Sequence, residues 1–416
     1  MKKLVRVTFF TALLTLVRMA SGFLIAKVVA IYTGPTGMAM LGQAQSLITS
    51  LNGVVTAPVG NGVVRFTAGN VENGFSACAP WWRAALQISV ILLLIVVPLG
   101  FIFSTQISDW LFSNTQYYWV VMIACAFLPF SVINTFFTSI INGQQQYKRY
   151  IQVGMISVVS STVLMVFLIA KFQLQGALVA AAVNSSIAGC VMLMICCRQP
   201  WFRFRYWLGF TGKKEHKDIG KYVLMAMTSA LATPVALVII RNILIEHVGW
   251  DFTGQWQAVW KISEVYLAVI TMALSTYYLP RLSTISGIDN IKKEINQTAY
   301  IIMPIVSALA FIVYLCRDLS ITLLFTEAFR DARDLFAVQL IGDVVKIFSW
   351  LYAFPMLAKG AVKWFVGTEV LFSMTLVLFS WFFILKYGVS GAPMAYLANY
   401  SVYSLFIYFN LKRFAM

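Results

Sequence analysis

Seven charged side chains stand inside long apolar stretches of this sequence, where a charge is expensive in hydrocarbon. They are Arg18, Lys27, Arg241, Lys261, Glu264, Asp343 and Lys346. Five of these seven are cations and two are carboxylates, so positive charge is in excess among them. Lys27 and Arg241 lie close enough to an end of their stretches to snorkel to the membrane surface, whereas Arg18 lies near the middle. A water-filled cavity lined with cations is the cheaper arrangement, and such a cavity would bind an anion.

Four of these charges form two i,i+3 pairs, Lys261 with Glu264 and Asp343 with Lys346. This spacing places both members of a pair on one helix face. Two interpretations follow. In the first, each pair neutralises itself and holds two helices together. In the second, the lysines bind an anion, and the carboxylates act as their charge partners or as coupling groups.

Aromatic residues accompany the first pair. Trp256, Trp260 and Glu264 follow one another at one-turn intervals and therefore share a stripe of their helix. Trp256 lies near the end of its apolar stretch, which is typical of an aromatic belt at the membrane surface. The alternative is a stacking surface for sugar rings, formed by Trp256 and Trp260 with the amides of Gln43 and Gln255.

The elements that must position these residues are membrane helices. Of the 416 residues, 60% are hydrophobic and 11% are charged, whereas a soluble chain carries roughly a quarter charged residues. The first apolar run is too long for a signal peptide and lacks a cleavage site, so it is expected to remain. The predicted fold class is all-α, a polytopic membrane protein with twelve transmembrane helices. Apolar runs that suit a bilayer occur at 7–32, 38–64, 84–106, 118–141, 151–170, 174–196, 221–245, 253–280, 297–316, 335–358, 361–385 and 391–411.

Lys and Arg are distributed unevenly between the two sides of these spans. Of 31 such residues, 21 fall on the side of the N-terminus, five on the opposite side and five within spans. The positive-inside rule therefore places both termini in the cytoplasm. It also explains most of the net charge of +16 without a nucleic-acid partner.

The longest polar segment divides the chain into two predicted lobes. Residues 198–220 are basic and rich in aromatics, which fits the anionic inner surface of a membrane. They separate an N-terminal six-helix lobe, 1–197, from a C-terminal six-helix lobe, 221–416. The lobes look related, because LIAKVVAIYTG at 24–34 resembles VIIRNILIEHVG at 238–249, and GQAQ at 42–45 matches GQWQ at 254–257. A parallel repeat of this kind predicts a central site that opens alternately to each side of the membrane.

Cofactor chemistry and catalysis find no support in the sequence. Six cysteines and two histidines lack metal-ligand spacing. No phosphate-binding G-x-x-x-x-G-K-[ST] loop occurs, so transport would have to run on an ion gradient or the membrane potential. A membrane polysaccharide polymerase or ligase would carry a large outer loop with acid/base residues, whereas the outer loop at 316–336 is short. A drug exporter for cations would need an acidic cavity. No cofactor, no metal and no enzymatic activity are predicted.

Three long stretches resemble the Wzx-type flippases of bacterial lipid-linked oligosaccharides, in the polysaccharide-transport branch of the superfamily that includes the MATE multidrug exporters. They are TLVRMASGFLIAKVVAIYTGPTGMAMLGQAQSLIT at the start, WQAVWKISEVYLAVITMALSTYYLPRLS in the eighth span, and FRDARDLFAVQLIGDVVKI entering the tenth. The resemblance covers essentially the whole chain. It is strongest to enterobacterial flippases for O-antigen units and for the lipid III of the enterobacterial common antigen.

The resemblance implies a V-shaped, MATE-like pair of six-helix lobes around a cationic cavity, in the bacterial inner membrane. The implied activity is translocation of an undecaprenyl-pyrophosphate-linked O-antigen unit from the cytoplasmic to the periplasmic leaflet, with the lipid III unit as the alternative substrate. Partners would be this glycan lipid, the bilayer, and the polymerase and chain-length regulator of the same pathway. The cations implied as headgroup contacts are Arg18, Lys27, Arg241, Lys261 and Lys346, with Glu264 and Asp343 as coupling or partner groups.

Overall fold

The computed structural model describes the backbone of residues 2–415 and the side chains of residues 13–220 and 222–415. Lys2, Lys3, Arg6 and Lys221, which were counted among the cytoplasmic cations, have side chains outside the described residues. Every regular element between residues 2 and 415 is a helix, as the predicted fold class requires.

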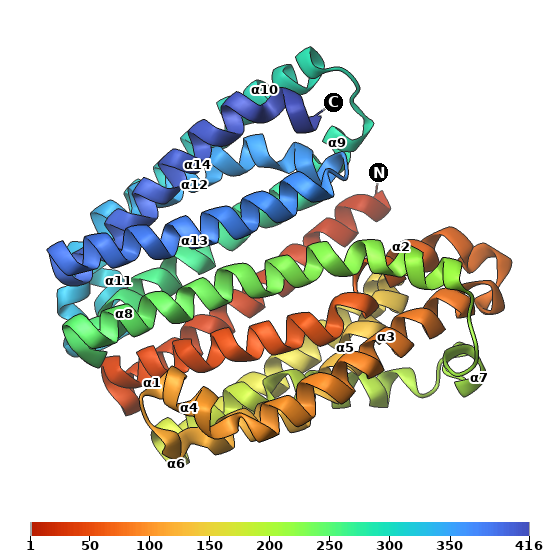
Figure 1. The fold of residues 1–416 in the computed structure, drawn as a ribbon, viewed down its shortest axis with the longest axis horizontal. Helices are drawn as coiled ribbons and strands as arrows, with labels where there is room; N and C mark the ends of the chain where they lie inside the picture. Colours follow the sequence, from red (N-terminus) through yellow and green to blue (C-terminus); the bar gives the residue numbers. More distant parts are fainter. Residues whose placement is uncertain (1, 416) are drawn as a thin grey trace. The chain divides into compact units, whose positions relative to one another are not determined.

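Fourteen α-helices follow one another in the described chain (Figure 1). They are α1 (Lys2–Thr56), α2 (Asn61–Asn70), α3 (Phe75–Ile102), α4 (Ser104–Phe112), α5 (Tyr118–Gly143), α6 (Tyr147–Cys196), α7 (Phe204–Trp207), α8 (Lys213–Ala273), α9 (Leu279–Thr284), α10 (Ile288–Leu315), α11 (Arg317–Leu324), α12 (Phe336–Ala358), α13 (Val362–Tyr387) and α14 (Gly391–Ala415). Short turns of 3-10 helix join several of them, and a π-helical turn, Leu274–Tyr278, joins α8 to α9.

Eight helical runs within residues 2–415 are long and apolar enough to cross a membrane, and four of them contain a break. A straight helix of 50 residues would be about 75 Å long, far more than the apolar thickness of about 30 Å. The breaks are at Gly34 (φ 64°), Gln173 (φ 48°), Gly249 (φ 83°) and the turn that begins at Gly388 (φ 59°). They leave twelve spans, which confirms the predicted number, including the division between the fifth and sixth.

Several predicted spans have different limits in the structure. The ninth, 297–316, corresponds to α10, which begins earlier, at Ile288. The second, 38–64, is interrupted where α1 ends at Thr56 and a 3-10 turn, Ala57–Val59, precedes α2. Pro58 lies in that turn and has no backbone N–H to continue the helix. The third, 84–106, corresponds to α3, which starts earlier, at Phe75, because the Trp81–Trp82 pair packs inward as part of the helix.

By its contacts the chain forms two units. The first comprises residues up to Val28 together with Gln43–Val235, and the second comprises Val29–Gly42 together with the chain from Ala236 onward. The boundary between Val235 and Ala236 lies within α8, so this long helix belongs to both units. The predicted lobe boundary, which follows the chain at 198–220, stays a prediction.

The basic segment after α6 folds onto the first unit. Trp201 is fully buried and stacks edge-on against Trp82 of α3 and Phe137 of α5. Arg205 donates a hydrogen bond to the Tyr206 hydroxyl (2.8 Å), which lowers the pKa of that phenol. This segment is therefore anchored by aromatic packing, and its cations are held beside the ends of α3 and α5.

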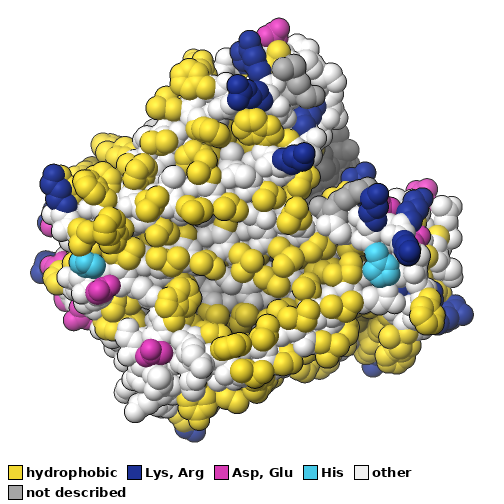
Figure 2. All heavy atoms as spheres, in the orientation of Figure 1, with side chains coloured by type: hydrophobic (Ala, Val, Ile, Leu, Met, Phe, Trp, Pro, Cys, Tyr) yellow, Lys and Arg dark blue, Asp and Glu magenta, His cyan; other side chains and the backbone are white. Residues whose placement is uncertain are grey.

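In the second unit α12 is the central helix, packed against α14, α10 and α13. Its core holds Leu274, Ile295, Ile347, Leu351 and Ile407. The outer faces of the helices are apolar in both units, with Leu94 and Ile102 of the first unit and Phe409 of the second at least two-thirds exposed. Figure 2 shows hydrophobic side chains along the helices and charged ones gathered toward the helix ends. This surface suits lipid rather than water.

Candidate functional site

A buried carboxylate joins three helices of the second unit. Asp343 of α12 is fully buried, and its carboxylate accepts hydrogen bonds from the hydroxyls of Ser263 (2.6 Å) and Tyr266 (2.7 Å) on α8 and of Tyr396 (2.9 Å) on α14. Lys346, the expected i,i+3 partner, forms no ion pair with it within 4.0 Å. Three hydroxyls, rather than the ammonium, are therefore the direct partners of the carboxylate. Lys346 still interacts with Asp343 electrostatically, so both interpretations of this pair stay predictions.

The Lys346 ammonium lies among four aromatic rings. Its Nζ is 4.9 Å from the ring centroid of Trp350, 5.4 Å from Tyr400, 5.6 Å from Tyr396 and 5.8 Å from Trp260. Rings at this distance attract a cation through their negative faces. They make the burial of this lysine tolerable without consuming its charge, so the ammonium stays available to an anion.

The other predicted pair forms as expected. Lys261 Nζ lies 3.2 Å from Glu264 Oε2, with the two side chains 27% and 48% exposed. Trp260 Nε1 donates to Glu264 Oε1 (3.0 Å) and packs 5.4 Å from Trp256, which confirms the shared stripe. An ion pair this exposed contributes little to stability, at most about 1 kcal/mol.

These groups border a cavity of about 200 Å³ inside the second unit. Charged and polar side chains line it together with aromatic rings. The lining consists of Trp260, Ser263, Glu264, Leu267, Ala268, Thr271, Gln339, Lys346, Trp350 and Tyr396. The arrangement combines an ammonium, a carboxylate, an amide and flat apolar faces, which is a surface for a polar ring compound or an anion.

Arg241 occupies a separate and closed environment. It is 2% exposed, its Nε donates to Gln257 Oε1 (2.8 Å), and its guanidinium lies 6.0 Å from the ring centroid of Trp256. Gly42 of α1 approaches so closely that a Cβ there would lie 2.8 Å from the Gln257 side chain and 3.0 Å from Arg241. Snorkelling, which was one explanation for Arg241, is wrong, because the residue is packed inside the unit.

Gln255 and Trp256, two predicted sugar contacts, are occupied within the protein. Gln255 donates to the carbonyl of Ala328 (2.6 Å) and accepts from the amide of Ala332 (3.1 Å), so it holds the 3-10 segment Glu327–Leu335 in place. Trp256 is only 2% exposed, which makes the aromatic-belt interpretation wrong. Neither residue lines the cavity near Lys346.

The remaining predicted residues belong to the first unit. Arg18 is exposed and Lys27 is half-buried, both on α1, while Gln43 is fully buried. The structure thus gathers Trp260, Glu264 and Lys346 around one cavity and leaves these three residues in another unit. A single cavity lined by all five cations stays a prediction.

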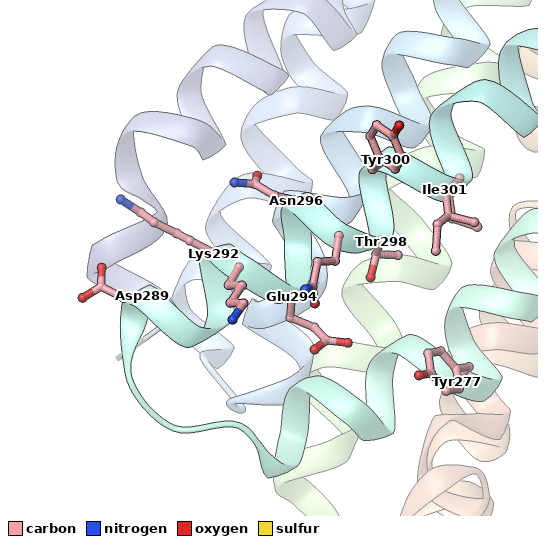
Figure 3. Close-up of a pocket in the computed structure, with 11 residues that line it drawn as sticks. Tyr277, Asp289, Lys292, Glu294, Asn296, Thr298, Tyr300 and Ile301 are labelled. Carbon is pink, nitrogen blue, oxygen red and sulfur yellow. The ribbon is translucent and has the colours of Figure 1, made fainter.

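A wider cavity, of about 930 Å³, lies along the beginning of α10 (Figure 3). Glu294 and Tyr277 reach into it from two different helices, and Asp289 and Lys292 lie near the start of α10. Its charges balance, because the two carboxylates offset Lys292 and Lys293. It was not predicted from the sequence, since these residues read as a cytoplasmic loop and the start of a span.

Sequence reasoning also missed Gln339, Trp350, Tyr396 and Tyr400. The two tyrosines are four residues apart on α14 and meet edge-on with their ring centroids 4.9 Å apart, so the i,i+4 spacing was a usable signal. Gln339 and Trp350 carried none, because a lone amide or indole in an apolar helix does not reveal which neighbour it faces.

Comparisons with solved structures establish the architecture. An inward-facing multidrug resistance MATE family transporter of the MOP superfamily superposes with a TM-score of 0.76, covering 96% of this chain and 95% of that one at 15% identity. The chain has the MATE fold. An outward-facing MATE transporter gives 0.66 over 99% of this chain and 96% of the other, at 13% identity. A MOP superfamily transporter from Pyrococcus furiosus, described as having a binding pocket of reverse polarity, gives 0.63 over 99% and 94%, at 13% identity. This MATE-fold chain is a multi-pass membrane protein.

Comparisons of sequence identify two similar bacterial proteins. The lipid III flippases of Escherichia coli K12 and of Shigella flexneri are each 28% identical to this chain over 411 residues, covering 96% of both partners. No protein-family model matches the chain. Both named relatives are transporters, which agrees with the prediction of a transporter without enzymatic activity.

Proposed function

We propose that this protein is a flippase for lipid-linked oligosaccharides. It would move the polar head of an undecaprenyl-pyrophosphate-linked glycan across the inner membrane of a bacterium, from the cytoplasmic to the periplasmic leaflet. The observation that carries the proposal is Lys346, an ammonium set among aromatic rings beside a cavity in a membrane-spanning unit, with no carboxylate of the described residues in direct contact. Similarity to two lipid III flippases over 96% of the chain supports it.

Lys346 favours an anionic cargo over a cationic drug, while Glu264 in the same lining balances its charge. A cationic drug would meet the Lys346 ammonium, whereas a pyrophosphate would be attracted by it. Lys261 adds a second cation near the cavity, although Glu264 pairs with it at 3.2 Å. Arg18 and Lys27 stay candidate headgroup contacts in the proposal.

Alternating access would carry the head across while the prenyl tail stays in lipid. Outward movement of two negative charges is favoured by an inside-negative potential, by about 2.3 kcal/mol per charge per 100 mV, or about 5 kcal/mol in all. The potential is therefore a sufficient source of direction. Asp343 would couple the change of state to α8 and α14, since its carboxylate bonds hydroxyls on both helices.

The O-antigen unit and the lipid III unit are two substrates of the same chemistry. The sequence resemblance includes flippases for both, while the named relatives favour lipid III. In either pathway both termini would face the cytoplasm, and a polymerase and a chain-length regulator would receive the product.

The test combines reconstitution with complementation. Purified protein in vesicles should expose an undecaprenyl-pyrophosphate-linked glycan to an impermeant reagent on the far side of the membrane. Exposure should be faster when the donor side is electrically negative relative to the far side. Strains lacking an O-antigen or a lipid III flippase should regain one surface polymer, and which polymer returns identifies the substrate. A protein that leaves headgroup exposure at the rate of empty vesicles, and rescues neither strain, would contradict the proposal.

A further inference from the structure

The cavity beside Lys346 contains an amide that the protein does not satisfy. Gln339 of α12 lines this cavity and is fully buried. Among the described residues, neither its Oε1 nor its Nε2 has a hydrogen-bond partner. A buried donor and acceptor left unmatched are costly, so such a pair at a cavity wall is completed by ordered water or by a ligand.

The rest of the lining defines what kind of ligand completes the pair. Trp260 and Tyr396 pack 5.3 Å apart at one side of the cavity, and Trp350 also lines it. Flat aromatic faces bind the apolar C–H faces of a ring, while an amide, an ammonium and a carboxylate bind groups around its edge. Lys346 and Glu264 supply the charged donor and acceptor.

The size of the cavity limits the ligand. About 200 Å³ corresponds to about seven water molecules at their liquid volume of about 30 Å³ each. This space is large enough for one six-membered ring, and further sugars of a glycan would extend beyond the lining.

We propose that this cavity is the binding site for one pyranose ring of the transported glycan. Gln339 would pair with a neighbouring donor and acceptor on the ring, such as two hydroxyls or an acetamido group. The ring would stack on the aromatic wall, while Lys346 stays the proposed contact of the pyrophosphate to which this ring is joined. The inference rests on the proposed flippase function and adds to it the place where a sugar, rather than the pyrophosphate, is recognised.

The experiment compares two lipids in proteoliposomes, undecaprenyl pyrophosphate and the same lipid bearing one N-acetylglucosamine. Binding is measured by tryptophan fluorescence of the purified protein and transport by exposure to an impermeant reagent. Wild-type protein should prefer the sugar-bearing lipid. Gln339→Leu should weaken binding and transport of that lipid by about tenfold, the effect of leaving a polar pair on the ligand unmatched, while the sugar-free lipid changes less than twofold. The melting temperature should be unchanged or higher, because the variant removes an unsatisfied buried amide.

Thr368→Val is the matched control. Thr368 is also buried in the second unit, and its hydroxyl bonds the backbone of its own helix without lining the cavity. Its replacement should leave the preference for the sugar-bearing lipid intact. Three results would each overturn the inference. The wild-type protein could show no preference for the sugar-bearing lipid, Gln339→Leu could keep the wild-type preference, or Gln339→Leu could have a lower melting temperature than the wild-type protein. A wild-type protein that moves neither lipid would instead overturn the flippase proposal.

Discussion

Removing one oxygen from Tyr396 provides a quantitative test of the carboxylate that joins α8, α12 and α14. The Tyr396 hydroxyl donates to Asp343 at 2.9 Å, and both residues are at most 2% exposed. A hydrogen bond to a charged partner contributes about 1.5–3 kcal/mol. Ser263 and Tyr266 continue to solvate the carboxylate in the variant. We therefore expect Tyr396→Phe to lower the free energy of unfolding by about 2 kcal/mol, toward the middle of that range.

The assay is unfolding in mixed micelles by titration with a denaturing detergent, carried out as a double-mutant cycle. In an Asp343→Leu background the Tyr396→Phe change should cost much less, because its acceptor is gone. Tyr408→Phe is the control, since Tyr408 lies on the same helix but is 55% exposed. A loss below about 0.5 kcal/mol for Tyr396→Phe, or an equal loss in both backgrounds, would refute the assignment of this hydrogen bond.

Three further predictions concern packing and charge. Gly254→Ala should destabilise the protein severely, by more than about 3 kcal/mol, because the new Cβ would lie 2.0 Å from the Pro35 carbonyl oxygen. Gly220→Ala is the control: a Cβ there meets nothing within 4 Å, so this variant should be neutral or slightly stabilising. Thermal unfolding of both variants in detergent is the check. Lys346→Met should slow export of a pyrophosphate-linked glycan at least about tenfold, equivalent to about 1.4 kcal/mol, without lowering the melting temperature, and a variant that exports at the wild-type rate would remove Lys346 from the site. Arg18→Ala should abolish rescue of a flippase-deficient strain while membrane insertion stays normal, because this side chain is exposed and carries no core packing; full rescue would contradict its role as a headgroup contact.

Much of the fold was readable from local properties of the chain. Run length and hydropathy predicted twelve spans. The glycines at positions 34, 249 and 388 lie at turns between spans, where the backbone has a positive φ that glycine adopts easily. The i,i+3 and i,i+4 rules correctly joined Lys261 to Glu264 and Trp256 to Trp260, because these pairs share one helix.

These spacing rules could not predict which residues on other helices contact a buried group. Asp343 and Lys346 have the same spacing as Lys261 and Glu264, yet hydroxyls from α8 and α14 take the carboxylate and aromatic rings surround the ammonium. Gly342 contributes to this outcome, since a Cβ there would lie 2.5 Å from the Tyr396 ring, so the glycine allows that ring to lie against α12.

The sequence by itself therefore determined the class of protein, the number of spans and the presence of buried charge, because hydrophobicity and helix periodicity are properties of short segments. Which charges are closed off, as Arg241 is, and which border a cavity, as Lys346 does, became visible in the packed helices. The tertiary structure alone revealed Gln339 as an unsatisfied amide. The physical reason is that hydrogen bonding and desolvation of a side chain depend on atoms from helices far away in the chain, and their packing is not encoded in any single one.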